Sequence, residues 1–367
     1  MIISIIACFV LSALLSWVSI PSIIKVAKEK HLYDEPDDDR KIHEERVPTL
    51  GGIAIFAGVI IVSTFFLKND TQINFGAIFS AILILFFTGM KDDIIALPPY
   101  KKMLAQLLAA GIVVFNGNVR LTSLYGLFGI EEINPILSVI VSVFTFIVII
   151  NSFNLIDGIN GLAGGIAIIV CSTFGTWFYM HEYSDLAVLA FSTAGASAGF
   201  LYHNLLKGNI FMGDTGSLII GMITAVLAVA FISLNQHSQG LLSSSKAPVF
   251  AISVLIIPLF DTLRVFIIRI SNKKSPFNGD RNHLHHLLVD AGYTHTKASF
   301  LLYLGNMFFI GLAFAVCQLN TFVFLAIIIG IALIFNQILV SIFLKKKIIH
   351  HKKNTQNASK MAFESAA

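Results

Sequence analysis

The sequence predicts an all-α integral membrane protein, a polytopic helical bundle of about eleven membrane-spanning helices. Its residues are 56% hydrophobic and only 13% charged, and the mean hydropathy is +0.81. Soluble domains carry about 25% charged residues, so a chain this apolar could not cover a water-exposed surface with polar groups. The apolar stretches are continuous rather than alternating, which indicates helices and not the strands of a barrel.

Charge-free runs mark the expected helices, because one crossing needs about 20 largely apolar residues. The last run, 298–344, is too long for one crossing and splits at Gln318-Leu319-Asn320. The other runs are 2–24, 50–67, 73–90, 103–119, 133–153, 160–180, 186–205, 216–234 and 247–263. The first run has neither a basic flank before it nor a small-residue cleavage site, so we expect a retained helix. Residues 1–344 then form a single transmembrane domain, and 345–367 form a basic tail that we expect to be disordered.

The distribution of Lys and Arg predicts the orientation. Eleven crossings place alternate loops on the same side, and one side then receives 22 of the 25 Lys and Arg residues. By the positive-inside rule this basic side is cytoplasmic, with the N-terminus outside and the C-terminus in the cytoplasm. Topology therefore accounts for the net charge of +4. Because the sequence contains no nucleic-acid motif either, we expect no nucleic-acid partner.

Nearly all the chemically interesting residues lie in loops on the basic side, at or beside predicted helix ends. Carboxylates, amides, histidines and cationic side chains that converge on one membrane face predict an active site. The segments are, in chain order, Arg40-Lys41-Ile42-His43, Lys91-Asp92-Asp93, 151–161, 212–216 and Asp280-Arg281-Asn282-His283-Leu284-His285-His286.

Two of these segments carry oxygen ligands. Asp92 and Asp93 directly follow the 73–90 helix, and such a pair suits Mg²⁺ shared with substrate phosphates. A solvated pair at a helix end is the alternative. Four further polar side chains recur at a spacing of three, namely Asn151, Asn154, Asp157 and Asn160. On a helix this spacing places them near one inward face; a hydrogen-bonded ladder between helices is the alternative, but four in phase favour function.

The remaining segments suggest recognition of anions. Asp214 opens the 216–234 helix, either as its N-terminal cap or as a ligand at a metal–phosphate site. Lys102 lies on the same side and meets either a diphosphate or lipid headgroups. Three histidines follow Arg281 in a spacing that does not fit zinc, and they favour phosphate recognition over an incidental surface loop: His283, His285 and His286.

With these residues in place, the chain resembles the polyprenyl-phosphate N-acetylhexosamine-1-phosphate transferase family over residues 1–345. The markers stand in the family's order: Asp92-Asp93, NSFNLIDGING at 151–161, FMGDTGS at 211–217 and DRNHLHH at 280–286. The resemblance implies a cytoplasmic cleft in the bacterial inner membrane that joins UDP-N-acetylhexosamine to undecaprenyl phosphate and releases UMP. Mg²⁺ is the implied cofactor, with Mn²⁺ as a substitute. The oligomeric state, a homodimer included, stays open.

The resemblance also implies roles for single residues. Asn154 and Asp214 match the Mg²⁺ ligands. Asp92, Asp93 and Asp157 match acidic positions in catalysis, and a base or nucleophile role is implied for the Asp92-Asp93 pair. The expected substrate-binding residues are Lys41, His43, Lys102, Asn151, Asn160, Arg281, His283, His285 and His286.

Several alternatives stay open at the level of sequence. The His-x-His-His form resembles the branch that uses UDP-N-acetylglucosamine, whereas three consecutive histidines are typical of the translocase branch that uses UDP-MurNAc-pentapeptide. Direct displacement and a covalent phospho-enzyme route are both compatible with these residues. A cation transporter would need its polar groups near mid-membrane, and a non-catalytic scaffold would need no metal-type ligands. The sequence therefore favours an enzyme.

Overall fold

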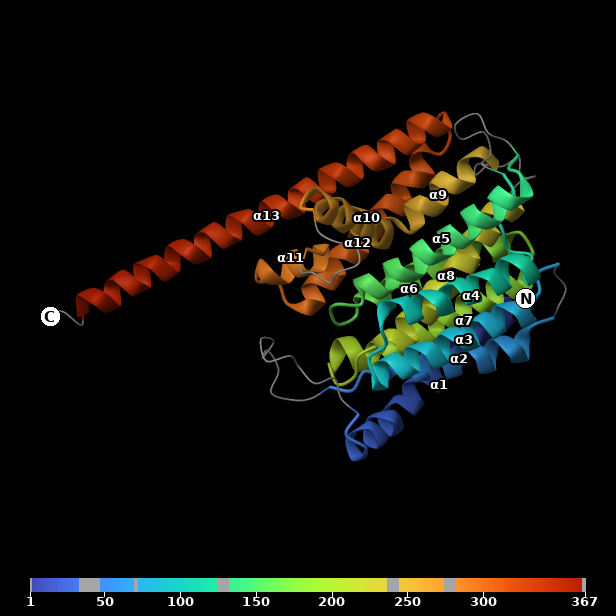
Figure 1. Ribbon diagram of the computed structural model, residues 1–367, viewed down its shortest axis with the longest axis horizontal. Coiled ribbons are helices and arrows are strands. Elements are labelled where there is room, and N and C mark those ends of the chain that lie inside the picture. Colours follow the sequence, from blue (N-terminus) through green and yellow to red (C-terminus); the bar gives the residue numbers. More distant parts are fainter. Residues whose placement is uncertain are drawn as a thin grey trace.

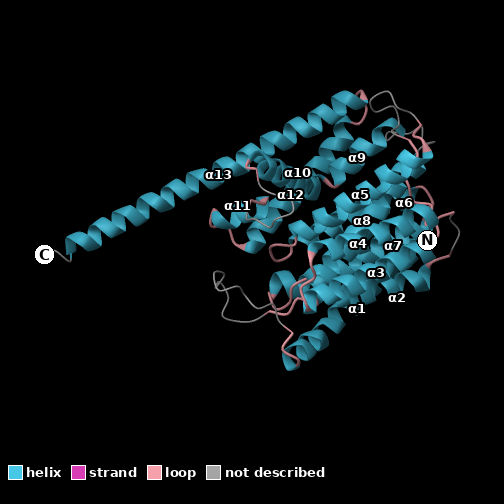
Figure 2. Cartoon of the chain, in the orientation of Figure 1, coloured by secondary structure: helices cyan, strands magenta, loops and turns pink. Residues whose placement is uncertain are grey.

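The computed structural model describes residues 2–32, 47–68, 72–123, 132–235, 244–273 and 282–364. These ranges are almost entirely helical, as Figure 2 shows, and their non-helical pairing is one isolated bridge between Ser123 and Glu132. The α-helices are α1 (Ile2–Glu29), α2 (Gly51–Phe66), α3 (Phe75–Ile94), α4 (Pro99–Asn116), α5 (Pro135–Ile156), α6 (Leu162–Met180), α7 (Ser184–Leu201), α8 (Gly213–Leu234), α9 (Ala247–Val254), α10 (Ile256–Ser271), α11 (Leu284–Asp290), α12 (His295–Val316) and α13 (Thr321–Glu364). A π-helical turn, η2 (Tyr202–Leu206), continues α7, and a 3₁₀ turn, η4 (Ser244–Lys246), precedes α9.

Helix α8 forms the centre of the bundle. It is apolar around its whole circumference, and 89% of its most apolar 18-residue stretch is buried inside the protein. A helix that is hydrophobic on all sides belongs in such a position. The same measure is only 22% for α1 and α13, which lie at opposite edges of the molecule, and α13 extends far beyond the other helices (Figure 1).

The expectation of a polytopic helical membrane bundle is confirmed. Within the described residues, eight helices are long and apolar enough to cross a membrane, or nine if the bent pair α9 and α10 is one span. Each predicted run contains a helix, but α2 has only 16 residues, and α4 carries Lys101, Lys102 and Gln106. The count of eleven crossings and the placement of the two termini therefore stay predictions.

The sequence predicted one straight crossing at 247–263, but the structure does not show one. The chain breaks at Leu255, and α9 and α10 are bent by 82° there. A break inside apolar surroundings leaves backbone groups that need partners. Asn306 of α12, fully buried, supplies them: its Nδ2 donates to the carbonyl of Val254 at 3.1 Å, and its Oδ1 accepts from the amide of Ile257 at 3.5 Å.

The C-terminal third divides into two helices where the sequence predicted, but its last helix is longer than expected. Helix α12 ends at Val316 and α13 begins at Thr321, so the predicted split at Gln318-Leu319-Asn320 is confirmed. Helix α13 does not end near 344. It runs through the segment that we expected to be a disordered tail, as far as Glu364.

Candidate active site

The two adjacent aspartates lie inside a helix and not after it. Helix α3 continues to Ile94, which places Asp92 and Asp93 in its last turn. Helix α4 begins at Pro99, four residues before the predicted run, with proline in its first turn. This early start brings Lys102 into the first turn of α4 and back against the end of α3.

Lys102 stands at the focus of three oxygen-bearing side chains. Its Nζ lies 2.5 Å from Asp214 Oδ2 and 3.2 Å from Asp92 Oδ2. The Oδ1 of Asn154 is 3.4 Å from the same nitrogen. The ends of α3, α5 and α8 thus supply oxygen atoms to one cationic group, far from one another in sequence but adjacent in space.

Asp93 has a different environment from Asp92. Its two carboxylate oxygens accept the amides of Asp214 at 2.7 Å and Thr215 at 3.0 Å, and the Thr215 hydroxyl at 2.5 Å. A carboxylate at a helix N-terminus satisfies free amides and interacts favourably with the helix dipole. Asp93 therefore caps α8 from a neighbouring helix. Asp214 is not the cap of its own helix, since the capping position belongs to Met212.

Gly213 makes this capping possible. Its φ of +71° is one that favours glycine,. A Cβ atom there would lie 2.0 Å from the backbone oxygen of Thr49 and 2.7 Å from both Asp93 oxygens. The first residue of α8 must lack a side chain for the aspartate to reach the amides.

The arrangement of Asn154 and Asp214 fits a divalent ion with oxygen ligands. The Asn154 Nδ2 also hydrogen-bonds Asp214 Oδ1 and donates to the Ser217 hydroxyl at 3.0 Å. Within the described ranges, no group of three His, Cys, Asp or Glu side chains could by itself hold a metal ion. A metal here would need an amide oxygen and substrate oxygens beside its carboxylates, which is the mixed set that Mg²⁺ commonly uses.

The run of polar residues at a spacing of three divides between a helix and a turn. Asn151 and Asn154 lie in the last turns of α5, which ends at Ile156, while Asp157 and Asn160 belong to the turn that follows. The expected common helical face is therefore wrong for the second pair. Asn151 exchanges hydrogen bonds with Gln106 of α4, at 2.7 and 3.4 Å. This amide pair joins two helices, and Asn151 does not line the cavity described below.

Side chains from two other elements fix the turn at 157–161. Asn204 of η2 accepts the amide of Gly161 at 2.5 Å and donates to the carbonyl of Ile210 at 2.7 Å. From α12, the Ser299 hydroxyl donates to the carbonyl of Asn160 at 2.8 Å, and the Tyr303 hydroxyl donates to that of Gly161. The turn that carries Asp157 is thereby held rigidly although it has no regular structure.

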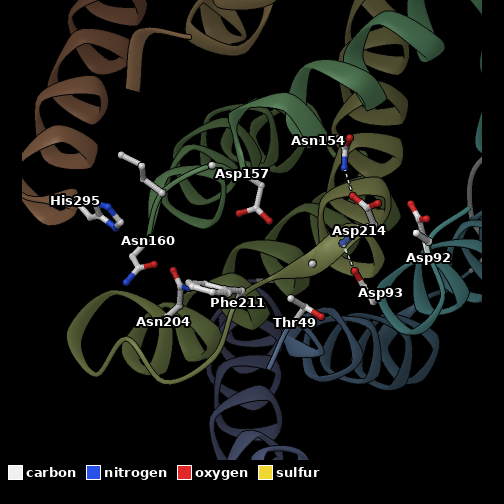
Figure 3. A pocket seen from close by; sticks show the side chains of 14 residues that line it. Thr49, Asp92, Asp93, Asn154, Asp157, Asn160, Asn204, Phe211, Asp214 and His295 are labelled. Carbon is white, nitrogen blue, oxygen red and sulfur yellow. Dashed lines mark hydrogen bonds between the residues drawn. The ribbon is translucent and has the colours of Figure 1, made fainter. Parts of the chain in front are cut away.

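These elements surround a cavity of about 610 Å³. In Figure 3, Asp157 lies between the charged group around Asp214 and a second group that contains Asn160 and His295. The cavity is lined by Thr49, Asp92, Asp93, Ala96, Asn154, Asp157, Gly158, Ile159, Asn160, Asn204, Phe211, Gly213, Asp214 and His295. The ends of α3, α5, η2, α8 and α12 meet there, which agrees with the prediction that the polar loops of one side converge.

Asp157 lies just outside the α5 span, and its pKa is shifted by its surroundings. Burial raises the pKa of Asp157 well above its usual range, and the nearby Asp214 and Asp93 carboxylates raise it further,. Three carboxyl groups thus share this side of the cavity, and the raised pKa favours the protonated form of Asp157. A cation, whether Lys102 or a metal ion, relieves the repulsion among these groups.

The predicted histidines gather beside the same turn. His283 precedes α11, and the three imidazoles form a cluster in which His285 is 5.5 Å from His283 and 4.2 Å from His286 between ring centres. A Cβ atom on Gly158 would lie 2.1 Å from His285 Nε2, so this ring rests directly on the turn. Lys41, His43 and Arg281 lie outside the described residues.

Sequence reasoning assigned no role to several residues that line the cavity, among them Thr49, Ala96, Asn204, Phe211 and His295. Two of them had a detectable signal, because Phe211 belongs to the FMGDTGS segment and His295 stands three residues before the predicted apolar run that begins at 298. Thr49 and Asn204 had none, since single polar residues at helix ends are common. Their place follows from contacts with residues more than 40 positions away, such as Asn204 with Gly161.

Comparisons with known proteins identify the family of the chain. The family model described as glycosyl transferase family 4 matches residues 75–232, which hold every residue of the charged group. The chain is 32% identical over 285 residues to an undecaprenyl-phosphate alpha-N-acetylglucosaminyl 1-phosphate transferase of Escherichia coli O157:H7, covering 76% of this chain and 74% of that protein. It is 30% identical over 342 residues to a probable undecaprenyl-phosphate N-acetylglucosaminyl 1-phosphate transferase of Bacillus subtilis (strain 168), covering 93% and 92%. A decaprenyl-phosphate N-acetylglucosaminephosphotransferase of Mycolicibacterium smegmatis is 30% identical over 291 residues, with 72% and 71% covered.

Proposed function

The chain belongs to glycosyl transferase family 4, and from this premise we propose that it transfers N-acetylglucosamine 1-phosphate to undecaprenyl phosphate. The relatives named for this reaction cover most of the chain and most of their own length. The acceptor is thus a polyprenyl phosphate, and the setting is a multi-pass membrane bundle. UDP-N-acetylglucosamine is the proposed donor.

One observation carries this proposal: oxygen ligands and a lysine converge in a cavity that helix ends form. The Lys102 Nζ has oxygen atoms of three side chains within 3.4 Å, namely those of Asp92, Asp214 and Asn154. A centre of this kind can bind a diphosphate through cations and can hold a divalent ion. A transporter would need such groups near the middle of its helices, whereas here they lie in the first or last turns.

The chemistry of the two proposed substrates requires an active site at the membrane surface. Undecaprenyl phosphate is anchored by its lipid chain, so its phosphate reaches only groups near the membrane surface. The nucleotide sugar is soluble and anionic, so it must arrive from an aqueous compartment. The loops rich in Lys and Arg support a site that faces the cytoplasm of the bacterial inner membrane, where nucleotide sugars and basic side chains would meet.

The transfer itself is a substitution at phosphorus. An oxygen of the lipid phosphate attacks the β-phosphorus of the UDP-sugar, the bond between that phosphorus and the bridging oxygen breaks, and UMP leaves with the bridging oxygen. Positioning and charge neutralisation carry most of the catalysis in such reactions. Both a direct and a two-step covalent route give these products.

We assign Asn154 and Asp214 to Mg²⁺, with Mn²⁺ as a substitute. When bound, the ion would neutralise the diphosphate and the developing charge on UMP. Asp92 is better placed than Asp93 to orient or deprotonate the acceptor, because every oxygen of Asp93 is used in holding α8. Lys102 would turn from the carboxylates towards the diphosphate, and the histidines would contact the nucleotide sugar.

The deciding experiment supplies purified protein with undecaprenyl phosphate, Mg²⁺ and labelled UDP-N-acetylglucosamine. We expect release of UMP and a labelled lipid, and loss of both on addition of a chelator. UDP-MurNAc-pentapeptide and other UDP-sugars run in parallel identify the donor. Absence of UMP and of lipid product with every UDP-sugar contradicts the proposed function.

A further inference from the structure

A buried aspartate on the bent helix α10 holds the start of the histidine segment, which we define as residues 283–286. Asp261 is only 1% exposed. Its Oδ2 lies 2.9 Å from His283 Nδ1, and its Oδ1 accepts the amide of Leu284 at 2.8 Å. One turn along α10, the Arg264 guanidinium donates to the carbonyl of Asn282. Helix α10 thus makes hydrogen bonds to three consecutive residues, Asn282, His283 and Leu284.

The carboxylate determines how His283 carries its proton. An ionised carboxylate only accepts hydrogen bonds, so Nδ1 of His283 must be the protonated nitrogen. Nε2 is then the nitrogen left for another partner. A carboxylate behind an imidazole is a recurrent means of fixing both the tautomer and the ring orientation.

The orientation of His283 is passed to the next imidazole. The rings of His283 and His285 lie 5.5 Å apart at an interplanar angle of 15°. His285 is 1% exposed, and neither of its ring nitrogens has a hydrogen-bond partner among the residues that the structure describes. A buried polar group without a partner is costly, so a ligand or water that completes it is expected at this place, beside Gly158.

Helix α10 can act in this way because its own direction is fixed. It leaves α9 at 82°, and Asn306 of α12 bonds to both sides of the break. The next turn of α12 towards its N-terminus carries Tyr303, which bonds the carbonyl of Gly161. The same helix therefore sets both the bend and the turn on which His285 rests.

We propose that Asp261 is a positioning residue for recognition of the nucleotide sugar, acting through His283. It fixes the imidazole proton on Nδ1 and places the histidine segment against the 157–161 turn. The identity of the substrate, a nucleoside-diphosphate sugar, rests on the proposed function. The contacts of Asp261 with His283 and Leu284 are independent of that function.

The test is the variant Asp261→Asn. The new amide keeps an oxygen for the Leu284 amide but offers a donor to His283 Nδ1, so the imidazole proton must move to Nε2. We expect KM for UDP-N-acetylglucosamine to rise by about tenfold or more, the size of loss seen when the partner that orients a metal-binding histidine is removed. KM for undecaprenyl phosphate should not change. The double variant with His283→Ala should lose no more activity than His283→Ala alone, because the two residues act as a unit.

Thr262→Val is the matched control. Thr262 is the next residue of α10, and its buried hydroxyl has no hydrogen-bond partner in the described ranges, so wild-type kinetics are expected. Wild-type kinetics in Asp261→Asn, or an undiminished effect of it in the His283→Ala background, overturns the proposal.

Hydrogen–deuterium exchange separates this proposal from the proposed function. In Asp261→Ala we expect faster exchange of the amides of 284–290, whereas Asp261→Asn should keep them protected. If the wild-type protein acts on no UDP-sugar, the proposed function falls, and exchange alone decides whether Asp261 holds the segment. Unchanged exchange in Asp261→Ala overturns the positioning role.

Discussion

The charged cluster (Asp92, Asp93, Lys102, Asn154 and Asp214) and the histidine segment lie beside the same turn but are built differently. In the cluster, each side chain is paired with another side chain or with backbone amides. In the histidine segment, one buried aspartate supplies the anchor, and the ring nitrogens of His285 have no hydrogen-bond partner within the described part of the chain. The side chains of the cluster hold one another in place before any substrate binds. The histidine segment is instead oriented by Asp261, and the imidazole of His285 is available to a ligand.

The difference follows from where the two regions attach. The cluster lies on the ends of α3, α4, α5 and α8, and α8 is the most buried helix of the bundle. Removing one member leaves a partly buried charge with fewer partners, which is costly,. The histidine segment forms the start of the short helix α11 and is anchored to the bent helix α10. Changes there should affect recognition of substrate more than the fold or the chemical step.

The largest effect is expected from Asp214→Asn, which tests whether the cluster is the chemical centre. The amide keeps the shape but removes the charge that faces Lys102 at 2.5 Å. A lost metal ligand removes several kcal/mol of transition-state stabilisation, a decrease in kcat of about 10³-fold. UMP release is the measurement, expression should stay near normal, and exposed Glu182→Gln serves as control. Activity near that of the wild type would show that the metal assignment is wrong.

A pair of glycine variants tests the contrast in stability. In Gly213→Ala the new Cβ meets the backbone of Thr49 at 2.0 Å, and a φ of +71° costs a non-glycine residue about 1–2 kcal/mol. We expect a clear fall in the melting temperature. In Gly158→Ala the obstacle is the His285 side chain at 2.1 Å, which can move. The melting temperature should then change little, while KM for the nucleotide sugar rises.

Gly111→Ala is the matched control for both variants. A Cβ there meets nothing within 4 Å, and alanine is favoured over glycine within a helix. The comparison fails if Gly158→Ala unfolds the protein as readily as Gly213→Ala, because the histidine segment would then be part of the rigid core.

The smallest expected effect is a dependence of stability on pH. Burial lowers the pKa of His285 well below its usual range, and His286, His283 and His295 lower it further. The unfolded imidazole titrates near pH 6.5, so below that pH the unfolded state binds the extra proton. This contribution to stability is present above pH 6.5 and is lost as the pH falls towards the pKa of the folded state.

We therefore expect the melting temperature to decrease between pH 7.5 and 5, and to decrease less in His285→Gln. His31→Asn, an exposed position, should retain the full dependence. Equal slopes in the wild type and His285→Gln would mean that His285 is not held neutral by its surroundings.

Much of the site was predictable because its polar residues occur in short motifs at the ends of apolar runs. Asp92, Asp93, Asn154, Asp157 and Asp214 were expected together, and the structure brings all five to one cavity. The division of labour between Asp92 and Asp93 was not predictable, since identical neighbours differ only in what their oxygens meet. Asn151 was expected in substrate binding, but it pairs with Gln106 across two helices. A spacing of three does not reveal where a helix ends.

By itself the sequence determined that this chain enters a membrane as a helical bundle and that its reactive groups gather at one side. A bilayer admits only segments whose backbone is satisfied internally, so continuous apolar runs must become helices and charges must collect at their ends. The tertiary structure alone decided the break at Leu255, the capping of α8 by Asp93 and the grip of Asp261 on His283. Each depends on contacts between residues 22 to 122 positions apart, or on the satisfaction of buried backbone groups, and neither leaves a local signal in the chain.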